Sequence, residues 1–205
     1  LYHEHISYGT LNDSDGNPFK TRDGGTKPLS ELFEETYQYI KNINSDLEDS
    51  TIKQLANSVL TFSDLITNRK TDYKFDLEKF TNVNGKTGLY VQYAQVRAKK
   101  LKQSIGLQKN EFDLLVLSDI DKHLLSLLFM FGYYLEQSSS LNEPHHLANY
   151  LYDISNSFNQ FYEHEKLSEI KDSNHLNSKL YLIDLFLTTS KNVMFCLGIK
   201  PVERM

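Results

Sequence analysis

Apolar side chains recur every three or four residues from Leu29 almost to the end of the chain. The first stripe follows one face of an α-helix, with Ser30 placed to cap its N-terminus; it consists of Leu29, Leu32, Phe33, Tyr37 and Ile40. A second stripe covers 52–60, and further helical patterns cover 88–105, 111–117, 120–138, 146–163 and 175–197. Gly198 and Pro201 suit the end of the last helix. This period predicts a mainly α chain, with the last three long helices meeting in the core.

Residues 1–28 have a different character, with turn signals at Asp15-Gly16 and Gly24-Gly25. The stretches 2–11 and 19–21 flank the first of these turns and predict an irregular hairpin. A hairpin alone is marginally stable, so we expect this piece to be the β-rich or irregular edge of a larger domain, partly detached here. Asn84-Gly85 marks another break. The expected division is therefore 1–28, a helical connector at 29–84, and a helical bundle at 85–205.

Composition narrows the class of protein further. The 205 residues carry 22 Lys and Arg against 27 Asp and Glu, a net charge of −5, which excludes a uniformly basic nucleic-acid binder but not a local basic patch. The longest apolar run, 124–135, is about half of a bilayer span, and no signal-peptide pattern opens the chain. We expect a soluble, intracellular protein without a membrane partner. Because the chain opens at Leu1 rather than Met, we also expect an excised fragment.

Two segments could carry chemistry. In the loop 18–26, Lys20 and Arg22 flank a hydroxyl and precede two glycines, so they could neutralise charge on a transferring phosphate. From spacing alone, a solvated turn with incidental charges is the more economical interpretation.

The second segment is 90–109. Tyr90, Tyr93 and Arg97 share one helical face, and a run without acids follows, with cations at Arg97, Lys99, Lys100, Lys102 and Lys109. Aromatic faces beside cations suit unpaired bases, which need stacking surface and phosphate neutralisation. The alternative is that the tyrosines belong to the core and the lysines to a solvated face.

The histidines and the single cysteine give weaker signals. His3 and His5 would share one face of a strand, and His145 and His146 are adjacent, but no carboxylate or cysteine at ligand spacing converges on either pair, so no metal site is expected. Cys196 lies in an apolar helix end and is expected to be a small buried hydrophobe. No hydrolase signature is present in the sequence.

At these residues the sequence resembles the C-terminal portion of the arginyl-tRNA synthetases, a class I family. The resemblance rests on five stretches that keep the family's order: 5–9 (HISYG) with the loop 15–22, 68–76 (NRKTDYKFD), 85–97 (GKTGLYVQYAQVR), 144–162, and the end at 197–205. Asp23 stands where the family usually has a small residue, and Val91 replaces the usual Leu or Met. The family's upstream His-x-Gly-His motif is not in this sequence.

The resemblance implies an anticodon-binding helical bundle preceded by a remnant of the catalytic domain. It implies a longer cytoplasmic enzyme that activates arginine with ATP and Mg²⁺ and transfers it to tRNA(Arg). Lys20 and Arg22 would lie near the ATP phosphates, and Tyr90, Tyr93, Arg97 and Met205 around the anticodon bases. The 205 residues alone would bind no cofactor, catalyse no adenylation and have no DNA partner.

An alternative from another class is a stand-alone helical protein-interaction domain, whose apolar stretch at 124–135 would be an assembly surface. Ionic strength separates the two hypotheses. Phosphate contacts make RNA affinity fall steeply with salt, whereas an apolar interface is much less sensitive.

Overall fold

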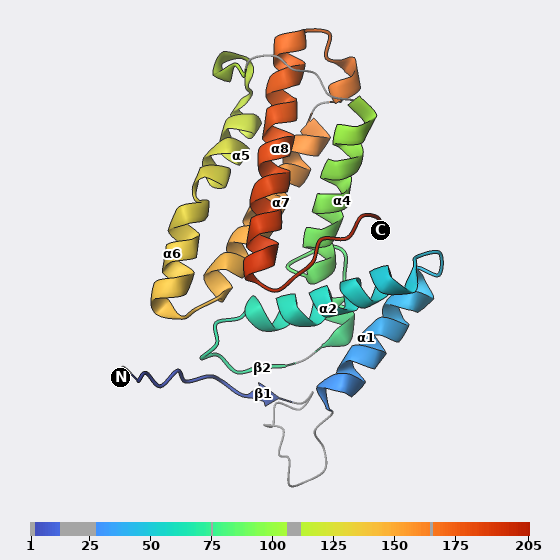
Figure 1. The fold of residues 1–205 in the computed structure, drawn as a ribbon, viewed down its shortest axis with the longest axis vertical. Coiled ribbons are helices and arrows are strands. Elements are labelled where there is room, and N and C mark those ends of the chain that lie inside the picture. Colours follow the sequence, from blue (N-terminus) through green and yellow to red (C-terminus); the bar gives the residue numbers. More distant parts are fainter. Residues whose placement is uncertain (1–2, 13–27, 75, 106–111, 165) are drawn as a thin grey trace.

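The computed structural model describes residues 3–12, 28–74, 76–105, 112–164 and 166–205 (Figure 1). Its elements are β1 (Leu11–Asn12), α1 (Leu29–Ile43), α2 (Asp49–Leu65), β2 (Tyr73–Lys74), α3 (Leu77–Phe80), α4 (Gly88–Ile105), η2 (Leu114–Val116), α5 (Asp119–Phe129), α6 (Phe131–Leu141), α7 (His145–His164), η3 (Leu167–Glu169) and α8 (Ser173–Cys196). In the described part of the chain no strand follows residue 90. The expectation of a mainly α protein is confirmed.

The bundle consists of α4, α5, α6, α7 and α8, with α7 packed against each of the others (Figure 1). Its core is apolar and closely packed: Phe158 of α7 stacks on Phe186 of α8 with ring centroids 4.2 Å apart, and both side chains are fully buried. Burying such a ring stabilises the fold by about 1.5–3 kcal/mol. The prediction that the last long helices meet in the core is therefore confirmed.

The segment 120–138 is two helices rather than one, because the chain breaks at Met130. Beside the break, the buried Tyr150 hydroxyl donates to the carbonyl groups of Leu127 and Leu128, at 3.0 and 3.2 Å, and the Leu127 carbonyl also accepts from the Met130 N–H. Leu128 is buried, while the neighbouring Phe129 is 74% exposed. The apolar stretch at 124–135 therefore lies partly in the core and is not one continuous free surface.

A buried ion pair joins α5 to α8. Lys179 Nζ lies 2.6 Å from Asp121 Oδ2, and both side chains are 1% exposed. Asp121 also closes the capping box at the start of α5, where its side chain accepts from the Ser118 backbone N–H at 2.8 Å. The pair fixes the start of α5 against the first third of α8.

In Figure 1, α2 crosses beneath the bundle, and α1 packs against α2. Gly88, at the start of α4, allows the close approach of α2: a Cβ at this position would lie 2.2 Å from the Ser58 carbonyl oxygen. A second apolar cluster joins α1, α2, α4 and the C-terminal tail, and it includes Ile40, Leu55 and Val202. The connector and the bundle therefore share buried contacts.

The start of α1 differs from the prediction. The helix begins at Leu29 and Pro28 occupies the N-cap position, so the proposed cap at Ser30 is wrong. The fixed φ of Pro28, −59°, directs the chain into the first turn, and no side chain caps it.

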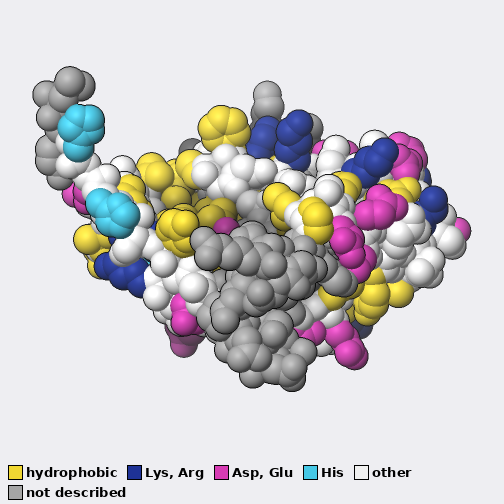
Figure 2. All heavy atoms as spheres, turned by 90° about the horizontal axis from the view of Figure 1, so that it is seen from below, with side chains coloured by type: hydrophobic (Ala, Val, Ile, Leu, Met, Phe, Trp, Pro, Cys, Tyr) yellow, Lys and Arg dark blue, Asp and Glu magenta, His cyan; other side chains and the backbone are white. Residues whose placement is uncertain are grey.

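Residues 3–12 are irregular or extended, and β1 pairs in parallel with β2, with Leu11 opposite Tyr73. Asp72 Oδ1 accepts from the Thr10 backbone N–H at 2.6 Å. The side chains of 3–8 are exposed. Seen from below, the molecule shows histidine side chains close to hydrophobic ones at one edge (Figure 2). The hairpin partner at 19–21 lies outside the described residues. No helix within the described ranges has the length and apolar character that crossing a membrane requires.

Candidate nucleic-acid interface

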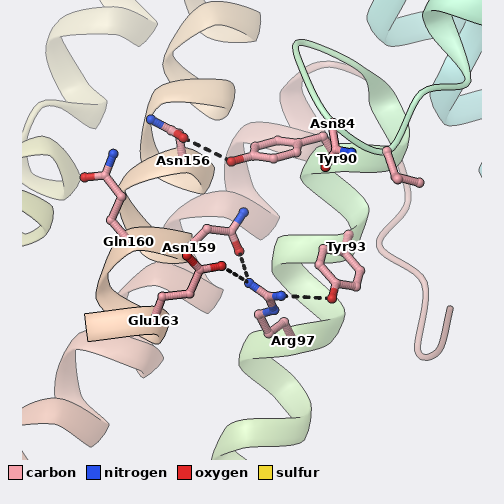
Figure 3. Close-up of a pocket in the computed structure, with 9 residues that line it drawn as sticks. Asn84, Tyr90, Tyr93, Arg97, Asn156, Asn159, Gln160 and Glu163 are labelled. Carbon is pink, nitrogen blue, oxygen red and sulfur yellow. Dashed lines mark hydrogen bonds and ion pairs between the residues drawn. The ribbon is translucent and has the colours of Figure 1, made fainter. Parts of the chain in front are cut away.

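A polar groove of about 520 Å³ runs between α4 and α7 (Figure 3). Its lining comes from α4, from α7 and from the loop before α4: Tyr90, Tyr93, Arg97, Asn156, Asn159, Gln160, Glu163, Val83 and Asn84. Three of the residues singled out from the sequence therefore face the same hollow. They share one side of α4 because they are spaced i, i+3 and i+7.

Arg97 contacts two tyrosine rings, one from α4 and one from α7. Its guanidinium lies 4.6 Å from the ring centroid of Tyr93 and 4.4 Å from that of Tyr162. It donates to Asn159 Oδ1 at 3.1 Å and to the Tyr93 hydroxyl at 2.9 Å, and it lies 3.5 Å from Glu163. With 19% of the side chain exposed, this fork keeps little conformational freedom to lose when it binds a ligand.

The two tyrosines of α4 differ in their surroundings. Tyr90 is half-buried against the core; its hydroxyl donates to Asn156 at 3.1 Å, and its ring lies 5.3 Å from that of Tyr152. Tyr93 is 41% exposed. The alternative that these tyrosines belong to the core thus describes part of the environment of Tyr90, while Tyr93 presents an accessible ring.

The C-terminus adds Met205 to this region. A second hollow of about 330 Å³ adjoins the groove and is lined by Tyr93, Arg97, Lys100, Tyr162 and Met205, with Val96, Leu101 and Ser104. Tyr93 and Arg97 line both hollows. All four residues expected around the bases, Tyr90, Tyr93, Arg97 and Met205, therefore lie in one region.

Two lysines of the run that begins at Arg97 are paired with acids from distant segments of the chain. Lys99 donates to the Val202 carbonyl at 3.0 Å and to Glu203 at 2.8 Å, and Lys102 pairs with Asp184 of α8. Lys100 lines the second hollow. Lys109 lies outside the described residues. The acids absent from the local sequence are supplied by distant segments.

Sequence reasoning missed the α7 side of the groove. Asn156, Asn159, Gln160 and Glu163 follow the i, i+3, i+4, i+7 pattern of a helix face. They lie beside the apolar stripe of α7 that enters the core, so the sequence does contain a polar stripe that could have indicated a second wall of the groove. The sequence does not show that this polar stripe faces Arg97.

Lys20 and Arg22, the two cations predicted to lie near the ATP phosphates, lie outside the described residues.

The expectation that no carboxylate converges on His145 and His146 is wrong, because Glu143 lies beside them. Glu143, His145 and His146 bring one ligand atom each within 4.8 Å of one another, with His146 Nε2 3.3 Å from Glu143. Burial lowers the pKa of His145, and nearby His146 adds to this effect. Burial raises the pKa of Glu143, but the hydrogen bonds from Lys70 and His146 outweigh it and hold the pKa below its usual value. The Lys70 ammonium and the N-terminus of α7 both add positive potential, which disfavours a metal cation.

Cys196 is exposed, so the expectation of a buried small hydrophobe is wrong. The last turn of α8 directs Val193, Met194 and Leu197 into the core and leaves Phe195 and Cys196 on the opposite side.

A helical bundle whose exposed edge carries an arginine in contact with two tyrosines, beside a row of amides, has the features of an RNA-binding helical domain. Comparison with known families agrees. The model of the DALR anticodon binding domain matches residues 91–205, and the model of the class I (R) tRNA synthetase catalytic domain matches residues 2–77. The chain belongs to the DALR anticodon-binding family, and residues 2–77 are similar to the class I (R) catalytic domain.

Individual proteins give the same result. The chain is 35% identical to an arginine–tRNA ligase of Alcanivorax borkumensis and 33% identical to one of Francisella tularensis subsp. novicida, over 98% of its own length and 36% of theirs. It therefore spans about a third of the curated relatives that it matches. The fold agrees with arginyl-tRNA synthetases of Thermus thermophilus (TM-score 0.86, 23% identity) and Plasmodium falciparum (0.77, 24%), over 98% of this chain and 35% of theirs. The resemblance inferred from the motifs is confirmed.

Proposed function

We propose that this chain is the C-terminal, tRNA(Arg)-binding part of an arginine–tRNA ligase, and that the α4–α7 groove receives unpaired anticodon bases. The observation that carries the proposal is the contact of Arg97 with two tyrosine rings, one from α4 and one from α7, in a hollow that Met205 also lines. A planar guanidinium held in this way can donate to a base edge or a phosphate, while the Tyr93 ring offers a stacking face. Tyr90 supports the groove wall through Asn156.

The activity of the longer protein forms a second part of the proposal and rests on the resemblance. The longer protein would act in the cytoplasm, activating arginine with ATP and Mg²⁺ and transferring it to tRNA(Arg). In it, Lys20 and Arg22 would neutralise negative charge on the ATP phosphates. The division into 1–28, 29–84 and 85–205 remains a prediction.

The binding proposal is tested by titrating the 205-residue chain with a tRNA(Arg) transcript and with the same transcript carrying an altered anticodon, at several salt concentrations. We expect tighter binding of the native anticodon and an affinity that falls steeply with salt. Equal affinity for the two transcripts would contradict anticodon recognition. An affinity insensitive to salt would favour the protein-interaction alternative.

The catalytic proposal has a separate test in arginine-dependent exchange of pyrophosphate into ATP. We expect none from the 205-residue chain, because positioning supplies much of such a rate and the family's upstream nucleotide motif is not in this sequence. In the longer protein, Lys20→Ala should lower the adenylation rate more than the affinity for transfer RNA. Exchange by the 205 residues alone would refute the first expectation.

A further inference from the structure

The C-terminal tail, residues 197–205, returns from α8 along α4 (Figure 1). Gly198 has a φ of +72°, and the Ile199 N–H donates to the Met194 carbonyl at 2.8 Å, so the chain reverses directly after α8. Ile199 and Val202 are then buried, at 2% and 1% exposure. The tail thus has a defined path although it contains neither helix nor strand.

Gln92 of α4 fixes this path. The side chain is fully buried, and its Nε2 donates to the Lys200 carbonyl at 2.7 Å and to Ser58 Oγ of α2 at 2.8 Å. Its Oε1 accepts from the Val202 N–H at 3.0 Å. The nitrogen and the oxygen of the Gln92 amide therefore both bond to the backbone of the tail, which sets the register of the tail on α4.

We propose that Gln92 is a positioning residue for RNA recognition, acting through the tail to hold Met205 beside Tyr93 and Arg97. This inference rests on the proposed function. Met205 lies three positions after Val202, so fixing Val202 confines Met205 to within about 10 Å of it. Without the hydrogen bonds from Gln92, the tail would lose conformational entropy when RNA binds, and this loss would weaken the binding.

The chain offers a matched control in Gln95, one turn further along α4. Its side chain is also buried, at 1% exposure. Its amide donates to the Leu187 carbonyl at 3.2 Å and to Ser190 Oγ at 2.7 Å, both in α8. Gln92→Met and Gln95→Met thus remove the same group from the same helix at similar burial, but the Gln95 bonds reach α8 rather than the tail.

The experiment combines each variant with Met205→Ala and measures affinity for the native and altered-anticodon transcripts. Discrimination is the ratio of the affinities for the native and the altered-anticodon transcript. We expect Gln92→Met and Met205→Ala each to reduce this ratio about fivefold, which is about 1 kcal/mol at 25 °C. The double variant should lose little more than either alone, because both act through one contact. Gln95→Met should leave discrimination intact and its double variant should behave like Met205→Ala. Amide exchange at Val202 should accelerate in Gln92→Met only.

A second pair keeps the test decisive if Gln92→Met does not fold. Lys99→Met removes the bond to the Val202 carbonyl, while Lys102→Met removes an equal charge paired with Asp184. Discrimination between the two transcripts should fall for Lys99→Met, whereas Lys102→Met should leave it unchanged. If the parent chain does not discriminate, the proposed function fails. If the parent discriminates but Gln92→Met matches Gln95→Met, or Lys99→Met matches Lys102→Met, the positioning role is refuted.

Discussion

Replacing Tyr93 with alanine tests the groove with the least risk to the fold. The ring is 41% exposed, and its main contacts are the Arg97 guanidinium at 4.6 Å and the hydrogen bond of its hydroxyl with Arg97 at 2.9 Å. An exposed cation–π contact contributes about 0.5–1 kcal/mol and a hydrogen bond about 1 kcal/mol, so the loss of stability should not exceed about 2 kcal/mol. A lost base stack costs about 1–3 kcal/mol, which is about 5- to 150-fold in affinity.

The assay titrates the parent and the Tyr93→Ala chain with native and altered-anticodon transcripts, with a thermal melt of each protein. Tyr93→Phe keeps the ring and should retain most of the stacking, which separates the ring from the hydroxyl. Tyr181→Ala is the matched control, because Tyr181 is an exposed tyrosine of α8 that packs on Phe112 and lines neither hollow. A Tyr93→Ala chain that melts normally and binds both transcripts like the parent would refute the groove as the anticodon platform.

Three further outcomes are expected. Lys179→Met should lower the free energy of unfolding by about 3–5 kcal/mol in urea titrations, because it leaves Asp121 charged and buried; a loss below about 1 kcal/mol would contradict this. Lys100→Ala should weaken both transcripts equally and lower the salt slope by about 1, whereas an unchanged slope would place Lys100 away from phosphate. The hydrogen bonds that Thr10 donates hold the pKa of Asp72 below its usual value, so the contact stabilises above about pH 3.9 and is lost as the pH falls through the folded-state pKa. The amide shift of Thr10 should report that loss in NMR titrations, and a pH-independent shift, or an unchanged profile in Asp72→Asn, would refute it.

The helices could be predicted because a helical period is a local property. Gly88–Ile105 matches the predicted 88–105, and the other long helices agree to within a few residues, since the stripe that enters the core repeats along each helix. The break at Met130 could not be predicted in this way. The hydroxyl that bonds to the carbonyl groups beside the break belongs to Tyr150, on another helix.

The same distinction applies to the candidate site. Tyr90, Tyr93 and Arg97 share a face by spacing alone, and the family motifs supplied Met205. No local pattern could show that Asn159 and Tyr162 hold Arg97, or that Asp184 neutralises Lys102. These partners lie far away in sequence.

Local patterns therefore identify most of the helical residues, the apolar side of each helix, and the three side chains of α4 that stand together. Tertiary packing sets which segment covers each side: α7 opposite Arg97, the C-terminal tail against Gln92, and solvent beside Cys196. A residue's place on its helix follows from the geometry of one turn, whereas its neighbours depend on how the whole chain packs its buried surface.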